Sequence, residues 1–144
     1  MKIRICALVV SAGIIAAGAA AAGKTTPAPQ TFDDVKKPVQ TFMNGLARHD
    51  FGMISSAWHS NGRIFVMETM HTIDFLKNIP ANVNIEVDTT EVLSVDAMIA
   101  VVKVQWRMLM PKTIGYHSSY MNLINLNGEW KIISETDYGD EKPR

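Results

Sequence analysis

A long run of alternating residues near the C-terminus, from Met98 to Met110, constrains the fold more than any other part of the chain. Polar residues of the run include Lys103, Gln105 and Arg107, and the positions between them are apolar. The alternating apolar set is Met98, Ala100, Val102, Val104, Trp106, Met108 and Met110. A period of two over this length predicts a β-strand with one buried face and one face in water.

A tight hairpin is predicted after this strand. The dipeptide Asn127-Gly128 separates two further strand-like segments, Tyr116–Leu126 and Glu129–Asp137. Asn-Gly readily supplies the positive φ angles of a two-residue hairpin turn. Upstream segments 63–67 and 84–95 also have strand-like composition, so we expect a largely antiparallel sheet.

Helices are predicted ahead of most of the sheet. Thr31 and Asp34 have the spacing of a capping box, and apolar residues follow at helical intervals. Asp50 is placed to begin a second, short helix, and Thr72 a third that stops before Pro80. Helices grouped before strands predict an α+β fold in one domain, 31–138, with a flexible lead, 23–30, and a charged tail, 139–144.

The first 22 residues are typical of a secretory signal peptide. Lys2 and Arg4 precede an uncharged apolar stretch that ends in small residues at Ala22. A transmembrane anchor is the alternative, although alanine and glycine make it a weak span. We therefore predict a secreted or periplasmic protein, cleaved near Ala22 and free of the membrane afterwards. Cleavage would remove Cys6, the single cysteine.

Charge patterning argues against a nucleic-acid partner. The chain has 14 basic and 14 acidic residues. Two of the basic residues fall in the predicted signal peptide, and no basic cluster occurs elsewhere. A nucleic-acid-binding domain normally carries such a cluster.

Three segments resemble a known superfamily. They are Val39-Gln40-Thr41-Phe42-x-x-Gly45-Leu46-x-x-His49-Asp50, Trp58-His59-Ser60-Asn61-Gly62-Arg63-Ile64, and Ser119-Tyr120-Met121-Asn122-Leu123-x-x-Leu126-x-Gly128-x-Trp130-Lys131-Ile132. In order and spacing they are similar to the nuclear transport factor 2-like superfamily, also called ketosteroid-isomerase-like. Among its bacterial members the chain most resembles the "putative lumazine-binding" and SnoaL-like, polyketide-cyclase-like domains. The resemblance implies a cone, in which a strongly bent sheet wraps about three helices and leaves a pocket.

The resemblance also gives a test for isomerase chemistry. The isomerases use a tyrosine, an aspartate base and a protonated aspartate. An ungapped alignment places Phe42, Val66 and Asn122 at those positions, so this mechanism is not expected. Glu68, two residues beyond the base position, would take that place only after a register shift.

Histidines are the remaining acid–base candidates, because imidazole titrates near neutral pH. We consider His59 and His71 as catalytic candidates. The alternative for both is structural: His59 ends a helix, and His71 precedes one with Asp74 nearby. His117 is expected on the outer face of its strand, and His49 at the end of the first helix.

No metal or cofactor is expected. Met67, Met70 and His71, together with Met108 and Met110, offer ligand types that suit Cu(I). However, Met108 and Met110 fall on the apolar face of their strand, where methionine is ordinary core filler. No catalytic triad, phosphate-binding loop or zinc spacing is present in the sequence.

A ligand-binding cavity is expected inside the cone, lined by aromatic side chains and an amide. Apolar cavities with a few polar groups are the usual form of small-molecule sites. Tyr120 and Asn122 are expected on the concave side, and the alternative is that bulky side chains fill the cone. The proposed ligand-binding residues are Trp58, Phe65, Trp106, Tyr116, Tyr120 and Asn122.

Three functions remain open at this point. The first is an exported domain that binds a small, partly apolar molecule without isomerase activity. The second is an enzyme of the lyase, cyclase or hydrolase type that uses His59 or His71. The third is an interaction module that forms a homodimer through the sheet face bearing Lys103, Gln105 and Arg107.

Overall fold

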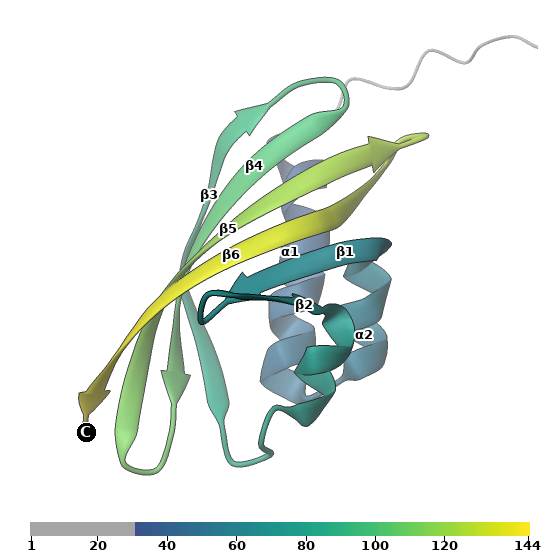
Figure 1. The fold of residues 1–144 in the computed structure, drawn as a ribbon. Coiled ribbons are helices and arrows are strands. Elements are labelled where there is room, and N and C mark those ends of the chain that lie inside the picture. The colour runs from purple at the N-terminus through teal and green to yellow at the C-terminus, as the bar shows by residue number, and fades with distance from the viewer. Residues whose placement is uncertain (1–30) are drawn as a thin grey trace, which may run out of the picture.

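The computed structural model describes residues 31–144, so the predicted signal peptide and the flexible lead, 23–30, lie outside the described residues. Two α-helices come first and the strands follow, with the 3-10 helix η1 between β2 and β3 (Figure 1). The elements are α1 Phe32–Arg48, α2 Phe51–Ala57, β1 Trp58–Val66, β2 Thr69–Thr72, the 3-10 helix η1 Ile73–Asn78, β3 Asn84–Val95, β4 Ile99–Leu109, β5 Thr113–Leu126 and β6 Glu129–Pro143.

Helix α1 begins with the predicted capping box. The Asp34 backbone N–H donates to the Thr31 hydroxyl at 3.3 Å, and the Thr31 backbone N–H donates to the Asp34 carboxylate at 3.1 Å. The helix ends at His49, which has the left-handed φ of 54°. Asp50 then caps α2 by accepting from the Met53 N–H at 3.0 Å. These local signals fix the tight turn between the two helices.

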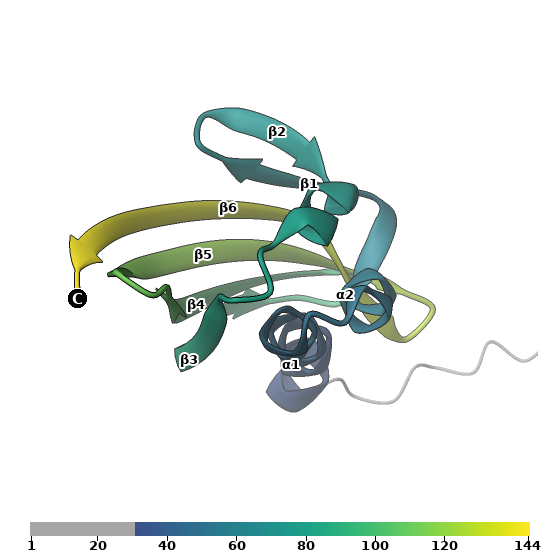
Figure 2. The ribbon, with the colours of Figure 1, turned by 90° about the horizontal axis from the view of Figure 1, so that it is seen from below.

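One curved, open sheet contains all six strands of the described chain. Its strand order is β2-β1-β6-β5-β4-β3, and only β1 and β6 run parallel. Seen from below, the sheet bends over α1, and α2 lies beside β1 (Figure 2). The expected α+β cone of the nuclear transport factor 2-like type is thus confirmed.

The predicted alternation of β4 is confirmed from Ala100 to Trp106, whereas Met98, predicted on the buried face, lies just before the strand and is 62% exposed. Ala100, Val102, Val104 and Trp106 are buried, and the intervening residues lie on the other face. These four side chains join residues of α1, among them Val39 and Phe42, in the core. The turn after β5 has positive φ at both Asn127 (56°) and Gly128 (94°), as a two-residue hairpin of this type requires.

The sheet is longer than the sequence predicts. The segment expected to be a charged tail, 139–144, continues β6 as far as Pro143. It pairs with residues 113–117 of β5, so β5 also begins before the predicted Tyr116. A short strand, β2, precedes η1 and pairs with β1. Cross-strand hydrogen bonding holds these polar segments in the sheet, although their side chains give no burial signal.

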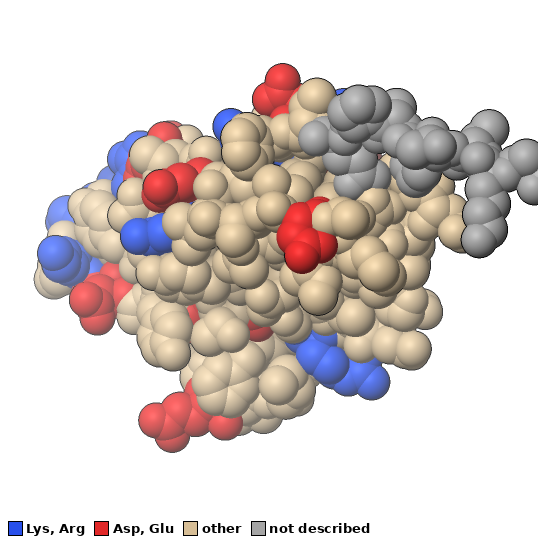
Figure 3. Space-filling model, turned by 90° about the horizontal axis from the view of Figure 1, so that it is seen from above, with Lys and Arg blue, Asp and Glu red and all other residues tan. Residues whose placement is uncertain are grey.

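On the face seen in Figure 3, basic and acidic side chains are interspersed, without a large patch of one sign. Among the described residues, no helix combines the length and apolar composition needed to cross a membrane.

Candidate functional site

A cavity of about 460 Å³ lies between the inner face of the sheet, α1 and η1. Its walls are mostly apolar, and its polar end is formed by β5 and β6. The apolar lining includes Phe42, Leu46, Ile64, Val66, Phe75, Leu76, Ile79, Ile85, Trp106, Met108 and Met110. The polar end contains His117, Glu135 and Asp137, with Asp140 and Glu141 further along β6.

A β-bulge brings the two carboxyl groups inside. In the pairing of β5 with β6, Leu123 lies opposite Ile132 and Asn122 opposite Ser134, so Ile133 is an extra residue. Before the bulge, the buried side chains of β6 are Trp130 and Ile132; after it, the inward positions are odd-numbered. One inserted residue exchanges the two faces of a strand. Glu135 and Asp137 therefore face the cavity.

The His117 ring is held on both sides. It stacks on the Trp106 indole, with ring centroids 4.1 Å apart and planes 15° from parallel. Trp106 and Gly139 lie directly opposite His117 on the neighbouring strands. A Cβ at Gly139 would meet the imidazole at 2.6 Å, and one at Gly115 would meet Nε2 at 2.7 Å. The two glycines thus make the space that the imidazole occupies.

An ordered hydrogen-bond chain sets the orientation of His117. The Trp106 Nε1–H donates to the Ser119 hydroxyl at 2.9 Å, and that hydroxyl donates to Asp137 Oδ1 at 2.9 Å. Asp137 Oδ2 lies 2.8 Å from His117 Nδ1. Because an ionised carboxylate only accepts, Nδ1 carries the proton, and Nε2 of the neutral ring is an acceptor. Nε2 lies beside Gly115, which lines the cavity.

Glu135 is the most unusual titratable group of the site. Only 5% of the residue is exposed, and burial raises the pKa of its carboxyl from 4.5 to about 8. The negative charge of Asp137 adds to this rise in pKa, whereas the Ser119 hydroxyl opposes it. The single hydroxyl proton of Ser119 is donated to Asp137, so Ser119 stabilises the ionised form of Glu135 only weakly. Glu135 is therefore protonated at neutral pH.

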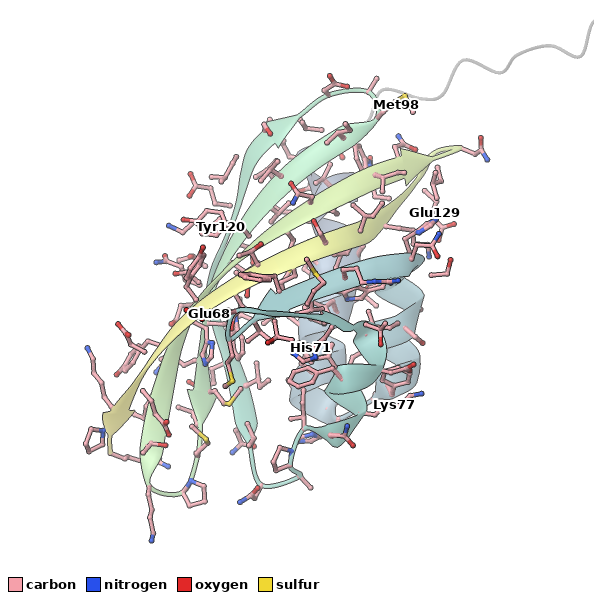
Figure 4. All side chains as sticks on the ribbon, in the orientation of Figure 1. Glu68, His71, Lys77, Met98, Tyr120 and Glu129 are labelled. Carbon is pink, nitrogen blue, oxygen red and sulfur yellow. The ribbon has the colours of Figure 1, made fainter. Side chains whose placement is uncertain are left out.

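The two histidines selected from the sequence lie elsewhere. His59 is half-buried at the start of β1, and its Nδ1 accepts from the Asn61 N–H at 3.1 Å. His71 stacks on Phe75 of η1 at 4.3 Å and projects toward that helix (Figure 4). Neither is among the residues that line the cavity. Their catalytic role stays a prediction. The contacts observed for both side chains are with residues close in the sequence.

The predicted orientation of strand β5 is wrong by one residue. Tyr120 is 38% exposed and points away from the helices (Figure 4). Asn122 is exposed as well and donates to the Ser134 hydroxyl at 2.8 Å on the outer face. His117, expected outside, faces inward with Ser119 and Met121, because the odd-numbered residues of β5 are the buried set.

Of the proposed ligand-binding residues, Trp106 lines the cavity. Trp58 belongs to the core, where its ring meets Phe42 edge-on with centroids 5.4 Å apart. Phe65 is half-buried on the face of β1 opposite to Ile64, and Tyr116 is exposed on the outer face of β5. Phe42 and Val66 occupy the positions of the tyrosine and the aspartate base of the isomerases. Both line the cavity, and both are apolar.

Sequence reasoning missed Glu135 and Asp137. Their alternation with Ser134 and Thr136 matches an exposed strand end, and the bulge that turns them inward leaves no local sequence signal. Gly115 and Gly139, on either side of His117, were the available hint, because glycine in a strand often marks a close approach. Among residues 31–144, no group of three or more His, Cys, Asp or Glu side chains is arranged to hold a metal ion.

Comparison with known proteins assigns the family. Residues 30–136 match the model of the family described as "putative lumazine-binding". The chain belongs to this family. It lies within the nuclear transport factor 2-like superfamily, as the resemblance predicted. No curated protein matches the chain.

Solved structures share the fold at low sequence identity. A hexachlorocyclohexane dehydrochlorinase of type 3 from Novosphingobium barchaimii LL02 is similar with a TM-score of 0.70 and 11% identity, covering 78% of this chain and 88% of that one. A putative ketosteroid isomerase from Shewanella frigidimarina NCIMB 400 gives 0.63 and 12%, covering 73% and 94%. A putative scytalone dehydratase from Novosphingobium aromaticivorans DSM 12444 gives 0.63 and 8%, covering 78% and 86%. These likenesses establish the fold.

Proposed function

We propose that this protein is an exported domain that binds one small, partly apolar molecule in the cavity between the sheet, α1 and η1. The observation that carries the proposal is the cavity of about 460 Å³, with apolar walls and one polar end. Small-molecule sites typically occupy roughly 300–1,000 Å³ and combine apolar walls with a few polar groups that orient the ligand. The family description supports a small-molecule ligand as well.

A cavity-filling variant tests the binding proposal. Met108→Trp adds bulk at a half-buried position of the cavity wall, and Leu93→Trp makes a similar change on exposed β3 outside the cavity. Titration with the neutral apolar dye Nile red is expected to show saturable fluorescence enhancement in the wild type and in Leu93→Trp. Met108→Trp is expected to bind at least about tenfold more weakly, because the indole takes the dye's volume. Equal binding by all three proteins would refute the proposal.

Export is supported by the N-terminal sequence alone. Expression of the full chain in a bacterial host, followed by fractionation and N-terminal sequencing, is expected to give periplasmic protein that begins near Gly23. Uncleaved protein in the cytoplasm would contradict this part of the proposal.

A second candidate function is proton transfer to or from a bound substrate. It is favoured by the His117–Asp137 pair, in which Asp137 fixes the Nδ1 proton and leaves Nε2 as the base beside the cavity. Glu135, protonated at neutral pH, is available as an acid in the same cavity. The printed names of two similar structures, a dehydrochlorinase and a dehydratase, denote elimination reactions of the kind that such a pair can assist.

Isotope exchange tests this candidate. In D₂O, wild-type protein is expected to exchange carbon-bound protons next to the carbonyl of cyclic β-hydroxy ketones, as measured by NMR. His117→Gln is expected to be about a hundredfold slower or worse, the usual loss for a general base. His59→Gln and His71→Gln serve as controls that keep the rate if His117 is the base. Equal rates for wild type and His117→Gln would exclude His117 as a general base in this reaction.

A further inference from the structure

The ionisable residues that line the cavity are acidic with one exception, His117. Four acidic residues of β6 contribute to it: Glu135, Asp137, Asp140 and Glu141. His117 is the one group in the lining that can become positive, and among the described residues that line the cavity there is no lysine or arginine. Elsewhere on the described chain, acidic groups commonly have a basic partner; Arg107, for example, pairs with Glu86 and Asp88 on the outer face. The cavity therefore lacks the counter-charges that the outer surface has.

Glu135 is the acidic group that most needs a partner. It is 5% exposed, it lines the cavity, and the Ser119 proton nearest to it is directed to Asp137. The Asp137 carboxylate in turn is occupied by Ser119 and His117. A buried carboxyl without a good partner costs free energy, and such groups in native proteins are usually satisfied by a ligand, water or ion.

The rest of the cavity suits the apolar part of such a ligand. Phe42, Phe75 and Trp106 supply aromatic rings, and aliphatic and methionine side chains supply the remaining walls. Aromatic rings attract cations through their negative faces, and they also pack against apolar groups. Flexible methionines adapt to irregular ligand shapes.

We propose that the cavity binds a small organic cation, with an ammonium-type head group against Glu135 and an apolar body between Phe42, Phe75 and Met108. This inference rests on the proposed binding function and specifies the chemical class of its ligand. An anionic ligand is disfavoured, because the lining offers it acidic neighbours and no fixed positive charge.

Binding of a cation is coupled to release of a proton. Free Glu135 is protonated near pH 7, whereas a cation pairs with its ionised form. The other titratable groups that face the cavity are His117 on β5 and Asp137, Asp140 and Glu141 on β6; the lining residues of α1, β1, η1, β3 and β4 are not titratable. Protonation of His117 repels a cation too, so the Glu135 contribution must be separated by substitution.

The probes are benzyltrimethylammonium and neopentylbenzene, which have the same shape and differ in charge. The ammonium probe is charged at every pH, so any pH dependence of its affinity comes from the protein. Displacement of Nile red at pH 9 is expected to show at least about tenfold tighter binding of the cation than of the neutral probe. Between pH 7 and pH 9 its affinity is expected to rise about tenfold, as the ionised fraction of Glu135 rises.

Glu135→Gln removes the proposed counter-charge and preserves the shape of the protonated side chain, so it is expected to fold. Glu91→Gln removes one exposed acidic charge on β3, outside the cavity, and is the matched control. The preference for the cation is expected to disappear in Glu135→Gln and to persist in Glu91→Gln. Calorimetry of the wild type at pH 7 in two buffers of different ionisation enthalpy is expected to show release of about one proton per bound cation.

The outcomes separate the two proposals. If the neutral probe binds as tightly as the cation and no proton is released, the cation inference is wrong and the binding function stands. If neither probe nor Nile red binds, the binding function is wrong as well. A cation preference retained in Glu135→Gln would also overturn the inference, because it would place the counter-charge elsewhere.

Discussion

The two halves of strand β6 show how one residue divides the apolar core from the polar end of the cavity. In the first half, Trp130 and Ile132 face inward and complete the apolar core. In the second half, Glu135 and Asp137 face inward and form the polar end of the cavity. The extra residue Ile133 lies between the halves and shifts the alternation. The same face of the sheet therefore packs into the core on one side of the bulge and lines the cavity on the other.

Insertion of one alanine between Ser134 and Glu135 is expected to have the largest effect on this division. With the bulge at Ile133 retained, the added residue takes the inward position of Glu135, and the inward positions of the second half pass to the inserted alanine, Thr136 and Tyr138, which the cavity does not accommodate. We expect a loss of at least about 5 kcal/mol in the free energy of unfolding, comparable with the whole stability of a small domain. Urea denaturation followed by circular dichroism measures it.

Ile133→Ala is the control for the insertion, because it keeps the residue count and the bulge. It is expected to cost only about 1 kcal/mol at this half-buried position. An insertion variant that is as stable as Ile133→Ala and still binds Nile red would show that the alternation set by the bulge does not determine which residues of β6 face the cavity.

A pH dependence of stability that arises from Glu135, in the second half of β6, is the next largest expected effect. The folded state keeps the proton on Glu135 up to about pH 8, whereas the unfolded chain loses it near the ordinary pKa of 4.5. Between these values the unfolded state binds fewer protons, so rising pH destabilises the fold. From pH 5 to pH 8 we expect roughly 3 to 4 kcal/mol of lost stability from this group.

Glu135→Gln is expected to remove that loss, so that the difference in unfolding free energy between variant and wild type grows with pH. The comparison at each pH cancels the contributions of other groups. Parallel stability curves for the two proteins between pH 5 and pH 8 would contradict the raised pKa of Glu135.

The smallest expected effect compares the two faces of β5. Ser119→Ala removes the hydroxyl that joins Trp106 to Asp137 in the buried network, and it is expected to cost about 1–3 kcal/mol. Asn122→Ala removes an exposed hydrogen bond to Ser134 and is expected to cost about 0.5 kcal/mol or less. Thermal unfolding of both variants tests the assignment of faces, since equal costs would argue against it.

Much of the scaffold could be predicted because its signals are local. The alternation of β4, the Asn127-Gly128 turn and the Thr31–Asp34 capping box each depend on residues close together in the chain, and each is present. The site was predicted less well. Trp106 was found because a bulky residue on an apolar strand face is also a local signal, whereas His117 was assigned to the wrong face of β5.

The sequence by itself determined the α+β class, the helical start, the half-buried strand β4 and the closing hairpin, because backbone geometry and burial periodicity are written in neighbouring residues. Tertiary structure decided which residues form the polar end of the cavity. The bulge at Ile133 exists only in the pairing of β6 with β5, and it alone turns Glu135 and Asp137 inward. The raised pKa of Glu135 likewise follows from burial against strands and helices distant in sequence, and no local pattern encodes that environment.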